Sequence, residues 1–383
     1  MFPGLLTFSW TQYKSITHLQ PFWSPTLRHC VLPYIHSDLK SIANRCPVLE
    51  NLEFRTTARH TADELSLLSE TIRACKRLKR LVCPALDSAA WNHLSNLHTL
   101  VTLRNYGPYR VPLDRDQLNF APFLNVTSLD FEVEMVADII TVMQHSEFPS
   151  LKQFTLHTIL LPWEKAEDLF RALSQCKAYQ TLEHVDILSW NAKAAQDLSC
   201  NSSTVIRQFL CFSQLRFLQL CLDSSIYLDN DLLSEAMSSW PHIQALHLVD
   251  LRSDQPSLTF RGLFAALRLC PHLHTLQVLV DAVNIDIDPN TESFQHTSLQ
   301  ELCLGSSPIE DPEVVARIIS SALPCVSQVT YHWNSRNAFE SAWDEVNTQL
   351  ESLAVLNAVS QEQQPIRPGL SSYAGTFLGC RVR

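Results

Sequence analysis

The chain has 383 residues, of which 46% are hydrophobic and 18% are charged, and this balance indicates a folded protein rather than a disordered one. Its formal net charge of −10 argues against a nucleic-acid partner, because neutralising phosphates requires a basic surface. Only seven glycines are present and none form a Gly-x-Gly pair, which excludes the fingerprint of dinucleotide-binding folds.

The N-terminus and the cysteines bear on cellular location. The first residues, MFPGLLTFSWTQYK, have no charged segment ahead of a short apolar run, so they make a poor signal peptide. No apolar run approaches the ~20 residues that span a bilayer. The twelve cysteines are dispersed and mostly lie in apolar contexts, which favours buried free thiols in a reducing compartment. We expect a cytoplasmic or nuclear protein with no membrane partner; the alternative is an extracellular repeat receptor.

A pattern of the form Leu-x-x-Leu-x-apolar recurs twelve times in chain order. Its anchor residues are Leu27, Cys30, Leu32; Leu49, Leu52, Phe54; Leu78, Leu81, Cys83; Leu97, Leu100; Val126, Leu129, Phe131; Leu151, Phe154, Leu156; Leu182, Val185, Ile187; Leu215, Leu218, Leu220; Ile243, Leu246, Leu248; Leu273, Leu276, Val278; Leu299, Leu302, Leu304; and Val326, Val329, Tyr331. The first anchors are 19 to 33 residues apart. This is the length of leucine-rich repeats, in which each unit is a strand plus a helix.

Helix signals lie between these strands. Thr61 and Glu64 form a capping box, and Asp311 is followed by a first-turn proline, Pro312. Asp231 and Thr259 precede two further apolar helical runs. The sequence therefore predicts an α/β fold, a right-handed leucine-rich-repeat solenoid or horseshoe of about twelve irregular strand-helix repeats.

We divide the chain into four parts. Residues 1–26 are an N-terminal segment or cap, and residues 27–335 are the repeat array. Residues 336–359 are a C-terminal capping helix, because Phe339, Trp343, Val346, Leu350 and Leu353 are spaced as one helical stripe. Residues 360–383, rich in Gln, Pro, Gly and Ser, are expected to form a flexible tail.

Motifs for catalysis and metal binding are missing from the sequence. The closest cysteines, Cys75 and Cys83, are eight residues apart, too far for a zinc knuckle, and no His-Glu-x-x-His motif occurs. His184 and Asp186 are acid and base types without an evident nucleophile. We therefore expect no enzymatic activity, catalytic residue, cofactor or metal, while an enzyme with a site on strand ends stays the less favoured alternative.

The remaining functional surface is the outward face of the strands. If the anchors point inward, their neighbours point to the concave side, where solenoids usually bind partners. The candidate protein-binding residues are Glu53, Arg55, Asp130, Thr155, His157, Asp186, Gln219, His247, Thr275 and Gln277.

Two passages, WSPTLRHCVLPYIHSDLKSIANRCPVLENLEF and ACKRLKRLVCPALDSAAWNHLSNLHTLVTL, resemble fungal, mainly basidiomycete, F-box leucine-rich-repeat proteins. The resemblance covers roughly residues 20 to 355. It implies that the repeats hold a protein substrate while an F-box docks the adaptor of a cullin-RING ubiquitin ligase. The 26 residues before Leu27 do not contain an F-box pattern, so the adaptor is an expected partner only if an F-box lies upstream. The alternative is a repeat-only interaction module.

Overall fold

Strands and helices alternate along the chain in a computed structural model that describes residues 2–11, 18–55, 60–107, 113, 118, 120–189, 204–222, 226–249, 256–288, 293–304, 306–330 and 339–362. The strands are β1 (Thr7–Ser9), β2 (His29–Leu32), β3 (Asn51–Phe54), β4 (Arg80–Cys83), β5 (Thr102–Gly107), β6 (Ser128–Val133), β7 (Gln153–Thr158), β8 (His184–Ser189), β9 (Phe217–Cys221), β10 (Ala245–Val249), β11 (Thr275–Gln277), β12 (Glu301–Cys303) and β13 (Val329–Thr330). The helices are η1 (Gln20–Phe22), η2 (Ser37–Ser41), α1 (Ile42–Arg45), α2 (Ala62–Ala74), α3 (Ser88–Ser95), α4 (Ala137–Gln144), α5 (Trp163–Gln175), α6 (Thr204–Phe209), α7 (Asn230–Ser239), α8 (Phe260–Leu267), α9 (Pro312–Ala322) and α10 (Glu340–Glu362).

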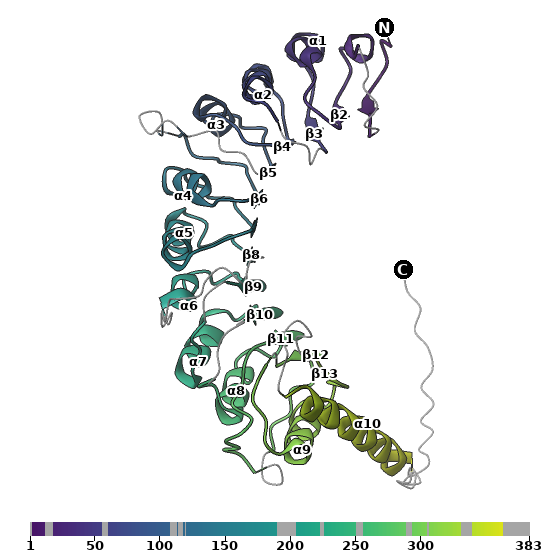
Figure 1. Ribbon diagram of the computed structural model, residues 1–383, viewed down its shortest axis with the longest axis vertical. Coiled ribbons are helices and arrows are strands. Elements are labelled where there is room, and N and C mark those ends of the chain that lie inside the picture. The colour runs from purple at the N-terminus through teal and green to yellow at the C-terminus, as the bar shows by residue number, and fades with distance from the viewer. Residues whose placement is uncertain are drawn as a thin grey trace, which may run out of the picture.

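The strands form one open, parallel sheet whose order, from β1 to β13, is the order of the chain. Each unit therefore pairs only with the units before and after it in the sequence. Figure 1 shows the result as an arc, with the strands along its inner side and the helices along its outer side. The predicted α/β class and the parallel stacking of strand-helix units are confirmed.

The anchor residues form the core between the sheet and the helices. Leu52, Leu81, Leu129 and Leu276 are each 0 to 1% exposed. Because side chains alternate along a strand, burying one face leaves the other free for polar residues. One continuous cluster of buried side chains runs from Phe8 to Leu350, so the array has a single elongated core.

A recurring turn sets the start of several strands. The N–H of the first anchor donates to a carbonyl three residues earlier, at 3.1 Å for Leu49 to Cys46 and for Leu273 to Cys270. Pro47 and Pro271 follow the acceptor residues, at the turn position where the fixed φ of proline is favoured. This proline-containing turn between helix and strand therefore sets where the next strand begins.

The same turn exposes an error in the predicted register of the fourth repeat. β5 pairs Leu103 with Leu81, so its anchors are Leu100 and Leu103 rather than Leu97 and Leu100. Leu97 lies in the turn and accepts the hydrogen bond of the Leu100 N–H at 3.0 Å. An apolar turn residue three positions before the first anchor imitates the Leu-x-x-Leu spacing, which shifted the prediction by three residues.

The sheet extends into residues 1–26, the predicted N-terminal segment or cap. Phe8 of β1 pairs with Cys30 of β2, so the first strand of the sheet lies within this segment. Leu5, Phe8 and Trp10 repeat the anchor spacing, a signal that was present in the sequence.

The expected helix starts are mostly confirmed. Thr61 and Glu64 form the reciprocal capping box, and Thr259 and Asp311 each accept a backbone N–H at the start of their helices. For α7 the capping residue is Asp229, two residues before Asp231, which lies in the first turn.

Helix α10 follows the last strand and packs against α9, with Trp343 and Val346 fully buried and Leu350 4% exposed. It occupies the region expected for a capping helix and extends to Glu362, three residues beyond the predicted end. Tyr331, the third anchor expected for the last repeat, and the predicted tail beyond Glu362 lie outside the described residues. Among the described helices, none is long and apolar enough to cross a membrane.

Candidate functional site

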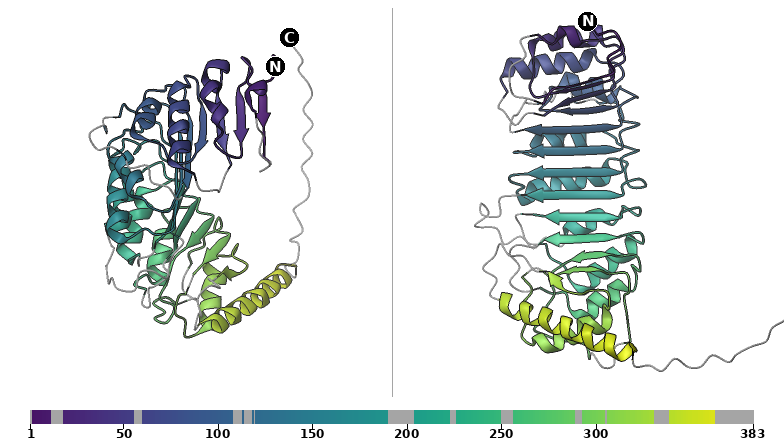
Figure 2. Two further views of the ribbon diagram at one scale, coloured as in Figure 1. Left: turned by 45° about the horizontal axis from the view of Figure 1, so that its top comes forward. Right: turned by 90° about the vertical axis from the view of Figure 1, so that its right-hand side faces the viewer.

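The strands lie side by side along the inner side of the arc, here called the concave face (Figure 2, right). The strand register places their outward side chains in three rows. The first row is Thr7, His29, Asn51, Arg80, Thr102, Ser128, Gln153, His184, Phe217, Ala245, Thr275 and Glu301. The middle row is Ser9, Val31, Glu53, Val82, Arg104, Asp130, Thr155, Asp186, Gln219, His247, Gln277, Cys303 and Thr330. The third row includes Tyr106, Glu132, His157, Leu188, Cys221 and Val249.

Near the middle of the concave face, one arginine bridges two carboxylates. Nε of Arg104 lies 3.2 Å from Oδ2 of Asp130, and its Nη2 donates to Oε2 of Glu132 at 3.0 Å. Burial raises the pKa of the Asp130 carboxyl above its ordinary value, while Arg104 and His157 oppose the rise. Glu132, by contrast, has a side chain that is 58% exposed. Burial therefore removes from the Asp130 carboxylate much of the water that would stabilise its charge.

Asp186 lies two strands further along the same row. Its Oδ2 is 3.4 Å from Nε2 of His157, a long contact, and its side chain is 19% exposed. Its other oxygen, Oδ1, is buried and has no hydrogen-bond partner among the described residues. A buried carboxylate oxygen without a partner is costly, so Oδ1 makes the charge of Asp186 expensive to hold at this position.

An aromatic group borders Asp186 on the side of β9 and β10. The rings of His184 and Phe217 stack with centroids 4.1 Å apart and planes 8° apart, and His247 meets Phe217 at a centroid distance of 5.6 Å. Nε2 of His247 is also 3.1 Å from Oγ1 of Thr275. Burial lowers the pKa of His184 and of His247, which favours neutral imidazoles at neutral pH.

The N-terminal part of the concave face is built differently. His29 and Asn51 are joined by a 2.8 Å hydrogen bond between Nδ1 and Nδ2, and Arg55 pairs with Glu53 at 2.6 Å. Arg80 is exposed and makes no ion pair with any described residue. These strands hold a pocket of about 350 Å³ lined by Thr7, His29, Cys30, Val31, Asn51, Leu52, Glu53 and Arg80.

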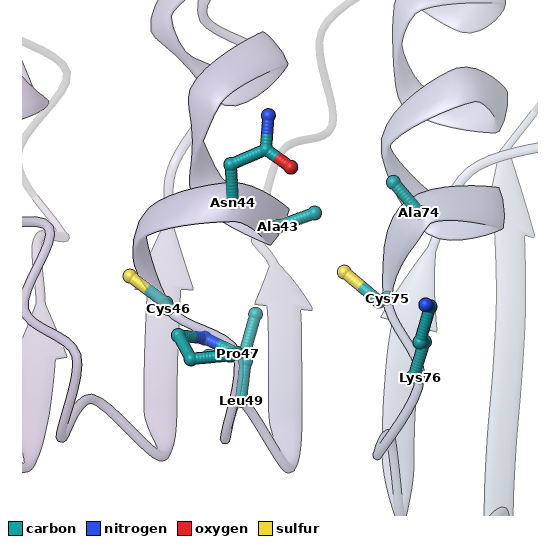
Figure 3. Close-up of a pocket in the computed structure, with 8 residues that line it drawn as sticks. All are labelled: Ala43, Asn44, Cys46, Pro47, Leu49, Ala74, Cys75 and Lys76. Atoms are coloured by element: carbon teal, nitrogen blue, oxygen red, sulfur yellow. The ribbon is translucent and has the colours of Figure 1, made fainter.

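A second pocket, of about 270 Å³, lies on the side of the turns that precede the strands (Figure 3). Cys46 ends α1 and Cys75 ends α2, so the two thiols come from neighbouring units. Burial raises the pKa of Cys46 to about 11 and of Cys75 to about 12. The raised pKa values keep both thiols protonated at neutral pH, and both side chains are buried in the core.

All ten sequence-predicted site residues lie on or next to the inner sheet face. Glu53, Asp130, Thr155, Asp186, Gln219, His247 and Gln277 share the middle row, Thr275 is in the first row, His157 is in the third, and Arg55 follows β3. The structure brings together His157 with Asp186, His247 with Thr275, and Glu53 with Arg55. A binding role for any of them remains a prediction.

Sequence reasoning missed Arg104, which pairs with Asp130. The register error in the fourth repeat caused the omission, since correct anchors at Leu100 and Leu103 place Arg104 on the outward face. His184 and Phe217 have the right spacing, but their stacking depends on strand pairing that local patterns do not encode.

Among the residues that the structure describes, no group of three or more His, Cys, Asp or Glu side chains is placed to hold a metal ion. Comparison with known proteins adds no name to this geometry: no protein-family model matches the chain, and no curated protein matches it.

Proposed function

We propose that this chain is a non-enzymatic, protein-binding scaffold of the leucine-rich-repeat type, a right-handed solenoid whose concave face holds a partner polypeptide. One observation carries the proposal: the strands line the inner side of the arc while helices α1 to α9 line its outer side (Figures 1 and 2), so the three rows of outward side chains face the hollow of the arc. Proteins built from stacked repeats generally bind their partners on such extended surfaces.

The composition of the concave face supports a protein partner. Arg104 and Phe217 belong to the residue classes enriched at protein interfaces. Asp186 adds a partly exposed carboxylate, whose closest ion-pair contact among the described residues is the 3.4 Å one to His157. The concave face carries a positive charge on Arg80 and negative charges on Asp130 and Asp186. Complementary charges on a partner give protein complexes their register and specificity.

On the resemblance to fungal F-box leucine-rich-repeat proteins, we further propose that the bound partner is a ubiquitination substrate and that the chain acts in the cytoplasm or nucleus. The free cysteines of the described residues support a reducing compartment. Co-purification of a cullin-RING ligase adaptor with the full-length protein is the test. If the partner binds and the adaptor does not, the chain is a repeat-only interaction module.

Photo-crosslinking tests the binding face directly. A photoreactive amino acid replaces Gln219 on the concave face in one variant, and Gln175 at the exposed end of α5 in a matched control. We expect a defined set of proteins, identified by mass spectrometry, to be captured from position 219 only. The affinity of a captured protein is then measured for the wild type and for the charge-reversed variant Glu53→Lys/Asp130→Lys/Asp186→Lys. Glu70→Lys on α2 is the control variant.

We expect the triple concave variant to lose binding while Glu70→Lys retains it, with circular dichroism confirming that each variant is folded. Equal capture from both crosslinking positions, or unchanged binding by the folded triple variant, would contradict a concave binding face.

A further inference from the structure

We infer that the concave face recognises an extended polypeptide segment carrying one acidic and one basic side chain about six residues apart, with the acidic side chain over Arg80 of β4 and the basic one over Asp186 of β8. This inference rests on the proposed function and specifies the chemistry of the partner.

The first pole of this surface is Arg80. It extends from the first row of the concave face, is exposed, and makes no ion pair with a described residue. The amide of Asn51, the ring of His29 and the carboxylate of Glu53, which is paired with Arg55, line the same pocket of about 350 Å³. A guanidinium beside polar donors suits a carboxylate, which it can bind through two parallel hydrogen bonds. An acidic side chain is therefore the complementary group at this end.

The second pole is Asp186. Oδ1 of its carboxylate is buried with no hydrogen-bond partner in the described parts of the chain, while Oδ2 has only the long 3.4 Å contact to His157. The neighbouring His184 and His247 have lowered pKa values caused by burial, so they contribute little positive charge at neutral pH. A lysine or arginine of the partner would supply the missing charge at the solvent-facing part of this carboxylate, whose side chain is 19% exposed. The ring of Phe217 on the next strand adds an aromatic surface for its aliphatic stem.

The charged groups on the strands between these poles, and Glu53 on the neighbouring β3, are already paired within the chain. Arg104 contacts both Asp130 and Glu132, and Arg55 contacts Glu53. Their pairing leaves one unpaired cation on β4 and one poorly paired anion on β8. The direction of the bound segment, acidic group toward β4 and basic group toward β8, follows from that asymmetry.

The strand spacing sets the distance between the two side chains of the partner. Arg80 and Asp186 are four strand steps apart in the sheet order, from β4 through β5, β6 and β7 to β8. At ~4.8 Å per step the separation is ~19 Å, and an extended chain covers about 3.3 Å per residue. A segment crossing the strands therefore needs about six residues between its acidic and basic positions.

The test begins with selection of peptides from a display library of random peptides about twelve residues long, twice the inferred spacing. The library is panned against the immobilised full-length protein, and enriched peptides are synthesised and titrated by fluorescence anisotropy. We expect enrichment of an acidic and a basic residue about six positions apart. Arg80→Gln and Asp186→Asn should each weaken binding about tenfold or more, the effect of losing one charge-assisted hydrogen bond.

A charge swap makes the assignment specific. Arg80→Glu should abolish binding of a selected peptide, and replacing the acidic residue of that peptide by lysine should restore its affinity. Arg77→Glu, in the exposed loop before β4, is the matched control and should leave the affinity unchanged.

Two results would overturn the inference, and they differ in what they say about the proposed function. In the first result, selected peptides lose binding to Glu53→Lys/Asp130→Lys/Asp186→Lys, but they lack the paired charges or bind Arg80→Glu as tightly as the wild type. The concave face would then bind a partner with another specificity. Selected peptides whose binding no concave variant alters would overturn both the inference and the proposed function.

Discussion

At the scale of single residues, Asp130 shows how a charged group on the concave face can lower stability. The pKa of its carboxyl lies above the ordinary value of 3.8, because burial disfavours the charged form more than Arg104 and His157 favour it. The folded protein therefore keeps this proton to a higher pH than the unfolded chain does. The contribution of Asp130 to the free energy of unfolding falls as the pH rises from 3.8 through the folded-state pKa.

Replacing Asp130 by asparagine should remove that loss. We expect the free energy of unfolding of Asp130→Asn, relative to that of the wild type, to increase as the pH rises from about 3 to about 6, so that the variant becomes relatively more stable. Urea unfolding across this pH range measures the difference. Glu132→Gln is the matched control, since Glu132 contacts the same arginine from a side chain that is 58% exposed. A difference for Asp130→Asn that stays flat with pH would contradict the assignment.

Gly262 is a second residue whose identity the fold restricts. A Cβ atom at this position would lie 1.9 Å from Oδ1 and 2.7 Å from Cβ of Asn230. Asn230 cannot easily retreat, because its Oδ1 accepts from the N–H of Thr259 at 2.9 Å and its Nδ2 donates to the Thr259 hydroxyl at 3.1 Å. The contact joins α7 to the N-terminus of α8.

We therefore expect Gly262→Ala to destabilise the protein by about 1–3 kcal/mol, the usual cost of overpacking. A double-mutant cycle with Asn230→Gly, read by urea unfolding, provides the check. The alanine should cost much less in the Asn230→Gly background, where the clashing side chain is gone. Equal costs in both backgrounds would mean that the clash is not the cause.

At the scale of elements, helix α10 closes the open end of the sheet. The side chain of Asn347 accepts from the N–H of Val329 at 2.8 Å and donates to its carbonyl at 3.0 Å, replacing the hydrogen bonds that a further strand would make. Val329 is 1% exposed, so water cannot satisfy these groups. The helix therefore protects the last strand through hydrogen bonds as well as through its apolar stripe.

Asn347→Ala should leave two buried backbone groups of Val329 unpaired and lower the free energy of unfolding by about 1–3 kcal/mol. Thermal and urea unfolding measure the loss. Thr348→Ala, on the exposed side of the same helix, is the control and should have little effect. Similar behaviour of the two variants would argue against a capping role for Asn347.

The elements also show how far sequence reasoning reaches. The buried anchors predicted most strands, because alternation along a strand is a local property of the chain. The predicted register of β5 was wrong for two reasons. Leu97, a partly buried residue of the preceding turn, repeats the anchor spacing. In addition, Asn105 occupies an inward position where a hydrophobic residue was expected. Asn105 is buried but satisfied, since its Nδ2 donates to the carbonyl of Pro84 at 2.8 Å.

The candidate site could be predicted only in part for a related reason. Alternation identifies which side chains face outward, so Asp130 and Asp186 were found from sequence. The partner of each depends on the neighbouring strand, which lies tens of residues away across a helix of variable length. The stack of His184 on Phe217 spans 33 residues of sequence and follows from the pairing of β8 with β9. Only the three-dimensional register reveals such contacts.

At the scale of the whole molecule, the strand order makes the array nearly one-dimensional. Each strand pairs only with its neighbours in the sequence, and a single core continues through all the units. In such arrays stability is carried by each unit and by its interfaces with the two adjacent units. A defect in one unit should therefore spread along the array and weaken with distance.

Leu276 in β11 allows this behaviour to be tested. Its side chain is 1% exposed, and Leu276→Asp would place an unpaired charge in the core, so we expect a loss of several kcal/mol. Gln277→Asp introduces the same residue at the next position, on the concave face, and is the matched control. Hydrogen exchange followed by mass spectrometry should show the greatest loss of protection in β10, β11 and β12, with progressively smaller losses toward β2. Uniform loss along the whole array would instead indicate one fully cooperative unit, and equal effects of the two variants would contradict the inward orientation of Leu276.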